Sequence, residues 1–489
     1  MPSPSPRTLA CAAAVLALAL GALALRPPAP ARAAGRPNIV FVLTDDLSWD
    51  LVRFMPQVRK LQRDGLTFAN YYVSDSLCCP SRASIFTGQF PHDTGVVYNT
   101  APHGGATTFR RRGGDRHTFA VALEAAGYRT AMMGKYLNDY RPQSRYVPPG
   151  WSQWAVPGNA YREFGYTLSL DGRPVGRGWK RHDYLTDVMS RRGSLFIRQS
   201  AVDHRPFFLE VATFAPHRPS TPAPRDRHRF RFLRAPRTAA YDVLTKDGAP
   251  WQRHFKPLSA AKRRKIDREF RRRARSVLAV DRLIEHLRQV VRRRGLERNT
   301  YVVFSSDNGY HLGQHRLVAG KQTAFDTDVH VPLVVAGPGV ARGATTAALA
   351  ENVDLGPTFE RLGGAPVPDW VDGHPLDALL HGGRPWDWRD AVLVEHHRPP
   401  RDPADPDVQP VSAGNPPTYE ALRTRGGTYV EYRHGGREYY DDRADPAQTV
   451  NAYGDLSAAR RDALHRALRA MATCHGRRAC WKASILTGP

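Results

Sequence analysis

The sequence predicts an α/β fold, in which helices cover both faces of a large, mostly parallel sheet and a smaller C-terminal antiparallel α+β subdomain follows. Three observations predict this fold. Continuous apolar runs of strand length recur as far as residue 336, and such runs are typical of strands buried on both faces of a sheet. Amphipathic helical patterns alternate with these runs. After residue 390 apolar and polar residues alternate, as in an antiparallel sheet.

The apolar runs predict five strands of the large sheet, over residues 37–44, 130–135, 207–214, 301–304 and 332–336. Polar residues follow several of them: Asp45-Asp46 the first, Ala215-Pro216-His217 the third and Asp307-Asn308-Gly309 the fourth. Open α/β sheets bind ligands at the carboxyl ends of their strands. We therefore expect the functional site at this edge of the sheet.

Helices are expected between the strands. One contains Pro80 in its first turn, a second covers residues 117–127, and a third, long and very basic, covers residues 259–294. Apolar residues at helical spacing give the third helix one apolar face: Ile266, Phe270, Val277, Ile284, Leu287 and Val291. In the C-terminal subdomain we expect strands at 391–395, 428–432 and 438–441, a surface loop at 398–417 and a helix at 458–472.

The chain has 489 residues, of which 41% are hydrophobic and 24% charged, enough for a large globular domain and a smaller one. Residues 1–33 resemble a secretory signal peptide, with Arg7, an apolar run over 9–25 and an A-x-A cleavage site at 31–33. A signal anchor is the alternative, but the apolar run is short for a membrane span. We expect a secreted protein without a transmembrane segment after cleavage, with domains at 34–385 and 386–489.

Outside the signal peptide the chain has four cysteines, Cys78, Cys79, Cys474 and Cys480. In an oxidising compartment the last two can close a short loop. The first two then have no distant partner, and a vicinal disulfide is one interpretation of them. Thiol chemistry is the other, because Arg82 and a helix N-terminus near Cys78 would favour a thiolate.

The run from Cys78 to Arg82, continued by Thr87-Gly88, resembles the sulfatase signature, Cys-x-Pro-Ser-Arg followed by Thr-Gly. In that family, part of the alkaline phosphatase superfamily, the first cysteine is oxidised after translation to formylglycine (3-oxoalanine), whose hydrated aldehyde is the nucleophile. The resemblance implies that Cys78 is the precursor of this nucleophile. It also implies that a formylglycine-generating enzyme is a partner during maturation, and that residues 34–385 are the catalytic domain.

The resemblance implies a metal site as well. Asp45, Asp46, Asp307 and Asn308 match the positions that bind Ca²⁺ together with the modified Cys78. An all-oxygen set suits Ca²⁺ or Mg²⁺ and suits zinc poorly. For a single Asp at a strand end, a turn or a helix cap is the alternative.

Three further positions match residues that contact the sulfate and its leaving oxygen: Lys135, His217 and Lys321. Arg82 matches the residue that holds the formylglycine oxygen and neighbouring charge. Taken singly, each Lys or His also fits an ordinary surface or strand-end residue. Many sulfatases have a His base two residues after the Lys of Gly-Lys, whereas this chain has Leu137 there.

Two stretches, 134–140 and 307–315, resemble the N-acetylglucosamine-6-sulfatase and heparan endosulfatase branch, and so does the C-terminal cysteine pair. This implies an exported enzyme that hydrolyses a sulfate ester of an amino sugar such as N-acetylglucosamine-6-sulfate. Asn138, His311 and His315 would contact that substrate. His311 and His315 are four residues apart and suggest zinc, but a zinc-peptidase Glu is missing and Gly313 would weaken a helix.

Other interpretations stay open at this point. The chain could be an arylsulfatase, a phosphonate or phosphodiester hydrolase of the same superfamily, or a non-catalytic basic glycan-binding protein in which Cys78 is never converted. The formal net charge of +25 would attract polyanions such as sulfated glycans, although a GC-rich genome also enriches arginine. Likewise, the arginines of helix 259–294 form either a solvated face or a glycan track. An exported protein without a nucleic-acid module is not expected to bind nucleic acid.

Overall fold

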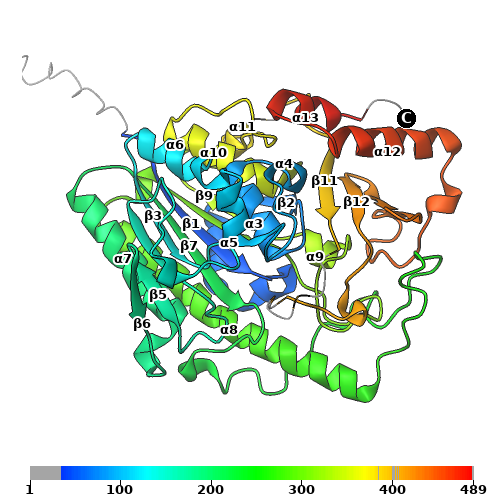
Figure 1. Cartoon of the computed structure of the whole chain (residues 1–489), viewed down its shortest axis with the longest axis horizontal. Helices are drawn as coiled ribbons and strands as arrows, with labels where there is room; N and C mark the ends of the chain where they lie inside the picture. The colour runs from blue at the N-terminus through cyan, green and yellow to red at the C-terminus, as the bar shows by residue number, and fades with distance from the viewer. Residues whose placement is uncertain (1–34, 384, 399–401, 403–404, 406, 487–489) are drawn as a thin grey trace, which may run out of the picture. The chain divides into compact units, whose positions relative to one another are not determined.

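The strands of the structure form two sheets, and helices cover both faces of the larger one (Figure 1). The computed structural model describes residues 35–383, 385–398, 402, 405 and 407–486, so the expected signal peptide lies outside the described residues. The larger sheet has ten strands, in the spatial order β10 (Ala344–Glu351), β2 (Leu66–Tyr72), β9 (Leu333–Ala336), β8 (Thr300–Ser306), β1 (Asn38–Asp45), β7 (Phe207–Pro216), β3 (Arg129–Gly134), β4 (Gln153–Pro157), β5 (Thr167–Leu170) and β6 (Arg173–Gly176).

The centre of this sheet is parallel. β1 pairs in parallel with β7 and β8, and β3 pairs in parallel with β7 and β4. β9 is antiparallel to both of its neighbours, and β4, β5 and β6 form an antiparallel extension. The predicted α/β class is therefore confirmed. The prediction lacked β2, β10 and β4 to β6, because these strands are short or are interrupted by polar residues.

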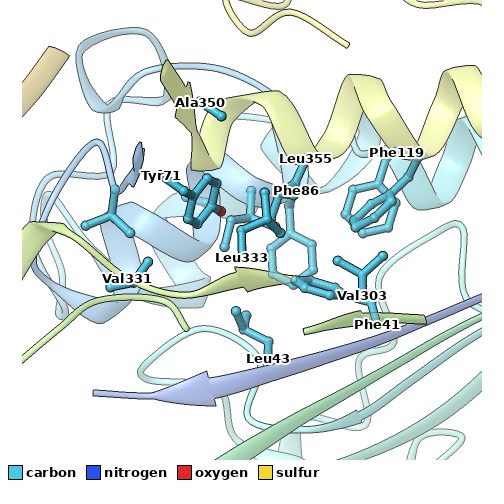
Figure 2. Packing of buried hydrophobic residues seen from close by; sticks show 14 of the residues in the cluster. Phe41, Leu43, Tyr71, Phe86, Phe119, Val303, Val331, Leu333, Ala350 and Leu355 are labelled. Carbon is cyan, nitrogen blue, oxygen red and sulfur yellow. The ribbon is translucent and has the colours of Figure 1, made fainter. Parts of the chain in front are cut away.

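Successive residues of β1 face opposite helical layers, which explains its unbroken apolar sequence. Phe41 and Leu43 pack with the layer formed by α3 (Cys78–Thr87), α6 (Phe119–Ala125) and α10 (Leu355–Gly363). Val40 and Val42 pack with the layer formed by α2 (Pro56–Asp64), α7 (Leu185–Val202) and α8 (Ala260–Arg293). Figure 2 shows the first of these clusters, in which side chains of α3, α6 and α10 lie over β1 and β8.

The long basic helix is α8, and Ser259 caps its N-terminus by accepting a hydrogen bond from the Lys262 N–H. All six apolar residues predicted for its inner face are buried. Among the described residues, no helix is both long enough and apolar enough to span a membrane.

The smaller sheet is antiparallel, in the order β11 (Ala391–His396), β12 (Tyr419–Thr424), β13 (Gly427–Tyr432) and β14 (Arg437–Asp441). The prediction omitted β12, which follows directly on the Gly- and Pro-rich stretch. Leu464, Leu468 and Met471 of α12 (Ala458–Met471) pack on this sheet. Cys474, which precedes α13 (Arg477–Ala483), forms a disulfide with Cys480 within that helix. Cys78 and Cys79 are free.

A histidine joins helix α4 (Pro91–Thr94) to the smaller sheet near this disulfide. Nδ1 of His92, in α4, lies 3.0 Å from Oε2 of Glu395, and its Nε2 lies 2.9 Å from the carbonyl oxygen of Cys474. Burial would lower the pKa of His92, but the hydrogen bond and charge of Glu395, with Asp93 nearby, raise it to about 9. The folded protein therefore holds His92 in its charged form.

This histidine predicts a pH-dependent stability. The folded pKa lies above the ordinary value of 6.5, so the stabilisation is fully present below pH 6.5 and is lost as the pH rises through about 9. The shift corresponds to about 3 kcal/mol in the free energy of unfolding. Denaturant unfolding at pH 6 and pH 9.5 should show that wild type has a larger free energy of unfolding than His92→Asn, and that this difference is smaller at pH 9.5. An equal difference in the free energy of unfolding at both pH values would contradict the raised pKa of His92. The control is His434→Asn, because His434 is exposed.

Candidate active site

Neighbouring parallel strands end at one edge of the large sheet and place polar residues there. In the order β8, β1, β7 and β3, these strands are followed by or end in Asp307, Asp45, His217 and Lys135. Cys78 starts α3 beside them, and its Sγ lies 3.2 Å from Oδ1 of Asp45. Residues far apart in the sequence thus meet at the carboxyl edge, as the strand pattern predicts.

An oxygen-rich cluster surrounds the end of β1. Asp46 has a φ of 64°, a conformation that Asp adopts more readily than most residues, and its backbone N–H donates to Oδ1 of Asp307 at 3.1 Å. Nδ2 of Asn308 donates to Oδ1 of Asp46 at 2.7 Å. Oδ1 of Asn308 is buried and has no hydrogen-bond partner among the described residues. This amide oxygen is thus available to a ligand.

Two lysines, both nearly fully buried, flank Cys78 and the carboxylates. Nζ of Lys135 lies 2.7 Å from Oδ2 of Asp45, and Nζ of Lys321 lies 2.7 Å from Oδ1 of Asp46 and 2.8 Å from Sγ of Cys78. Burial would raise the pKa of Asp45, but the positive charges of Lys135, His217, Arg82 and Lys321 hold it below its usual range. Burial would lower the pKa values of both lysines, but the neighbouring carboxylates raise them well above the ordinary value, so both ammonium groups are charged and can bind an anion.

The thiolate hypothesis expected Arg82 to lower the pKa of the Cys78 thiol, but Arg82 has other partners in the structure. Its side chain is fully buried, with Nε 2.7 Å from Oδ2 of Asp307 and Nη1 donating to the carbonyl oxygen of Lys135 at 2.7 Å. Burial, together with the negative charges of Asp407 and Asp45, raises the pKa of the Cys78 thiol well above its ordinary value. An unmodified Cys78 is thus a protonated thiol and a poor nucleophile.

Asp407 is a site residue that sequence reasoning missed. Its carboxylate lies 2.7 Å from Nε2 of His217, 3.3 Å from Nζ of Lys321 and 2.9 Å from Nδ2 of Asn99, and is buried. The described part of the predicted surface loop 398–417 thus reaches into the site, because the cationic groups there attract its acidic residues. The cationic side chains that hold Asp407, those of His217 and Lys321, could bind the anionic group of a substrate in the same way.

Comparison with known proteins decides the family. A family model described as Sulfatase matches residues 37–365, and one described as N-sulphoglucosamine sulphohydrolase, C-terminal, matches residues 313–473. N-acetylglucosamine-6-sulfatase of Homo sapiens is 34% identical over 452 residues, which cover 86% of this chain and 82% of that protein. The chain belongs to the sulfatase family. It is thus a sulfuric ester hydrolase.

Other similarities agree with this family. The extracellular sulfatase SULF-1 homolog of Drosophila melanogaster is 34% identical over 374 residues, 74% of this chain and 33% of that protein. A solved structure described as a complex with its substrate D-glucosamine-2-N,6-O-disulfate superposes with a TM-score of 0.76 at 24% identity, over 91% of this chain and 98% of that chain. A phosphonate monoester hydrolase from Silicibacter pomeroyi also superposes, with a TM-score of 0.65 at 22% identity, over 89% of this chain and 94% of that chain. The fold alone therefore does not separate sulfate from phosphonate esters.

Sulfatases typically use Ca²⁺ and a formylglycine, and the residues of this sulfatase fit both. Three carboxylates and the unpartnered amide oxygen of Asn308 form a set of hard oxygen donors, which suits Ca²⁺. Ligand atoms of Asp45, Asp46, Cys78 and His217 lie within 4.8 Å of one another. Cys78, the first residue of the sulfatase signature, is a free cysteine and belongs to this group of ligand atoms.

A cavity of about 240 Å³ opens beside Lys135 in this sulfatase, and its lining includes Asn138, Tyr161 and Phe214. The Tyr161 ring lies 4.3 Å from the His217 ring, 5.1 Å from Nζ of Lys135, and its hydroxyl accepts a hydrogen bond from Nδ2 of Asn138 at 3.3 Å. Leu137, which stands where many sulfatases have a His base, lines the cavity and packs in the core. It cannot act as an acid or a base. Tyr161 joins Asn138 at the wall next to the cationic groups.

The two predicted substrate histidines have side-chain partners outside the carboxylate cluster. Nδ1 of His311 lies 2.9 Å from Oδ1 of Asp328. Nδ1 of His315 lies 3.1 Å from Oγ1 of Thr245, and its ring stacks on Phe325 at 3.6 Å. Burial lowers the pKa of His315 to about 3, so this histidine is neutral. Among the described residues, no recorded contact joins either histidine to Cys78, and their contact with the substrate stays a prediction.

Proposed function

We propose that this sulfatase is exported and hydrolyses the 6-O-sulfate ester of N-acetylglucosamine or of a glycan that contains it. The observation that carries the proposal is the position of Cys78, whose Sγ lies 2.8 Å from Nζ of Lys321 and 3.2 Å from Oδ1 of Asp45. The substrate assignment is supported by the similarity to N-acetylglucosamine-6-sulfatases, 34% to 36% identical over most of this chain. Export is supported by the disulfide, which persists in oxidising compartments, and by the apolar leader expected at residues 1–33.

In the proposed site, Cys78 becomes formylglycine and provides the nucleophile. Residues 34–385 form the catalytic domain, and residues 386–489 form the C-terminal subdomain. Asp45, Asp46, Asp307 and Asn308 would hold Ca²⁺. When bound, the ion supplies positive charge that offsets the charge of the sulfate oxygens. The remaining chemistry belongs to the cationic side chains.

Lys135 and Lys321 would bind the sulfate oxygens, because their charged ends flank Cys78. His217 would donate a proton to the leaving oxygen. Its Nδ1 donates to the carbonyl oxygen of Arg218 at 2.6 Å, which fixes the ring and leaves Nε2 toward the site. Burial would lower the pKa of His217, but Asp46, Asp407 and Asp45 raise it, so the imidazole can carry the proton that it gives away.

The sugar would lie in the cavity beside Lys135. Tyr161 offers an aromatic face and Asn138 a polar side chain, which together suit the apolar ring and the hydroxyls of a sugar. A pocket whose polar groups pair with the substrate discriminates strongly, since a substrate without those groups leaves buried donors unpaired.

Tyr161→Ala is therefore expected to lower kcat/KM for N-acetylglucosamine-6-sulfate by about 10- to 100-fold, the range for lost contacts in a pocket. Hydrolysis of nitrophenyl sulfate should fall less, because that leaving group needs little positioning. Tyr161→Phe keeps the ring and serves as the matched control. An unchanged ratio of sugar to aryl turnover in Tyr161→Ala would remove the residue from the sugar site.

The substrate assignment is tested by turnover of a panel containing N-acetylglucosamine-6-sulfate, nitrophenyl sulfate and a phosphonate monoester. The proposal expects the highest kcat/KM for the sulfated sugar. A preference for nitrophenyl sulfate would make the protein an arylsulfatase, and a preference for the phosphonate would overturn the sulfate-ester assignment.

A further inference from the structure

The N-terminal half of α8 borders a hollow of about 510 Å³ that is lined mostly by arginines. Six of its lining residues are arginines: Arg234, Arg237, Arg263, Arg264, Arg268 and Arg271. The acid in the lining is Asp267, and its carboxylate is already paired with Arg237 at 2.9 Å. This surface therefore has a large excess of positive charge.

A second hollow, of about 420 Å³, adjoins the first, because Arg268 lines both. Lys265, Arg272 and Arg218 also line it, and the carboxylate of Glu269 there is paired with Arg218 at 2.9 Å. Arg218 is the residue whose carbonyl oxygen fixes the His217 ring. The two hollows together, which we call the α8 arginine groove, thus run from the neighbour of an active-site residue outward along α8, the helix at the lower side of Figure 1.

Arg263 of this groove is paired with Asp242 at 3.0 Å, but other arginines of the groove have no such partner in the described part of the chain. Arg264, Arg268 and Arg272 follow one another at four-residue spacing, are exposed, and have no recorded ion pair among the described residues. Like charges at this spacing destabilise a helix, so this arrangement is unfavourable for α8 alone. Burial and neighbouring arginines also lower the pKa of Arg275. Departures of this kind from local rules are expected where function maintains them.

We propose that the α8 arginine groove binds the sulfated polysaccharide chain that carries the ester, outside the active site. The inference rests on the proposed function, because that function makes the ligand a sulfated glycan. Residues 260 to 272 rise about 18 Å along the helix, longer than one sugar ring, so the groove suits a chain rather than a monosaccharide. The guanidinium groups would pair with its sulfates, and the release of bound counterions would favour the complex at low salt.

The test compares two triple variants that change the net charge equally. The groove variant carries Arg264→Glu, Arg268→Glu and Arg272→Glu, and the control carries Arg198→Glu, Arg443→Glu and Arg466→Glu, which are exposed and do not line the groove. The Kd for heparin is measured at several salt concentrations, together with kcat/KM for N-acetylglucosamine-6-sulfate. Circular dichroism verifies that the overall helix content is retained, and Arg→Gln versions at the three groove positions provide a second set without introduced acids.

We expect the groove variant to bind heparin at least about 10-fold more weakly, with a shallower salt dependence, and the control to change much less. Monosaccharide turnover should be unchanged. Equal weakening in the control would show a net-charge effect and overturn the proposal, as would no weakening in the groove variant. Equal affinity for double-stranded DNA, lost in the same variant, would overturn the sulfated-glycan assignment. A protein that binds heparin through the groove but hydrolyses no sulfate ester would refute the proposed function alone.

Discussion

Replacing Cys78 by serine is expected to reduce sulfate-ester turnover by about 10⁴-fold or more, the scale seen when a nucleophile is removed. A serine that stays unconverted has one hydroxyl and lacks the second oxygen of a hydrated aldehyde, which is needed to release the sulfate. The fold should survive, because serine has nearly the size of cysteine and can keep the contacts with Asp45 and Lys321.

Cys79→Ser is the matched control for this change. Cys79 is also buried and free, but it packs in the core layer of α3 and occupies the variable position of the motif. Its replacement should cost stability while leaving turnover within a few-fold of wild type. Turnover of Cys78→Ser within about tenfold of wild type would contradict the proposed nucleophile.

Asp307→Ala is expected to remove the metal and to destabilise the protein. Oδ2 of Asp307 lies 2.7 Å from Nε of Arg82, and neither side chain is exposed to solvent. Breaking a buried ion pair leaves an uncompensated charge and costs about 3–5 kcal/mol in the free energy of unfolding. The loss of a carboxylate also lowers calcium affinity, so turnover should fall with it.

The control for Asp307 is Asp203→Ala, which breaks a half-exposed pair with Arg129 and should cost less than about 1 kcal/mol. Denaturant unfolding with a chelator present separates the ion pair from the metal, and calorimetry measures calcium binding. Full calcium binding by a normally stable Asp307→Ala protein would remove Asp307 from the ligand set.

The α/β fold and the edge of the sheet at which the candidate residues meet could be predicted from the sequence, because the relevant signals are local. The apolar run before Asp45 and the run before Asp307 predicted the two strands, and parallel pairing brought their ends together. The register of that pairing, Leu43 opposite Ser305, was beyond prediction because no local pattern encodes it.

The missed residues lack such local signals. Asp407 lies in a Gly- and Pro-rich stretch without periodicity, and its burial depends on His217 and Lys321 and on the hydrogen bond from Asn99, all distant in sequence. Tyr161 lies between predicted elements, and its role depends on packing against His217. The four-residue spacing of His311 and His315 suggested zinc, but the chain between them turns at Gly313, which has a φ of 108°, and their side chains have different partners.

The most direct test of the central claim is mass spectrometry of the tryptic peptide over residues 64–82, together with turnover of N-acetylglucosamine-6-sulfate by the same preparation. The protein should be produced in a host that contains a formylglycine-generating enzyme. We predict formylglycine at position 78, with turnover proportional to the converted fraction across preparations. An intact Cys78 thiol in a protein that hydrolyses the ester at full rate would contradict the mechanism, and so would a fully converted protein without sulfatase activity.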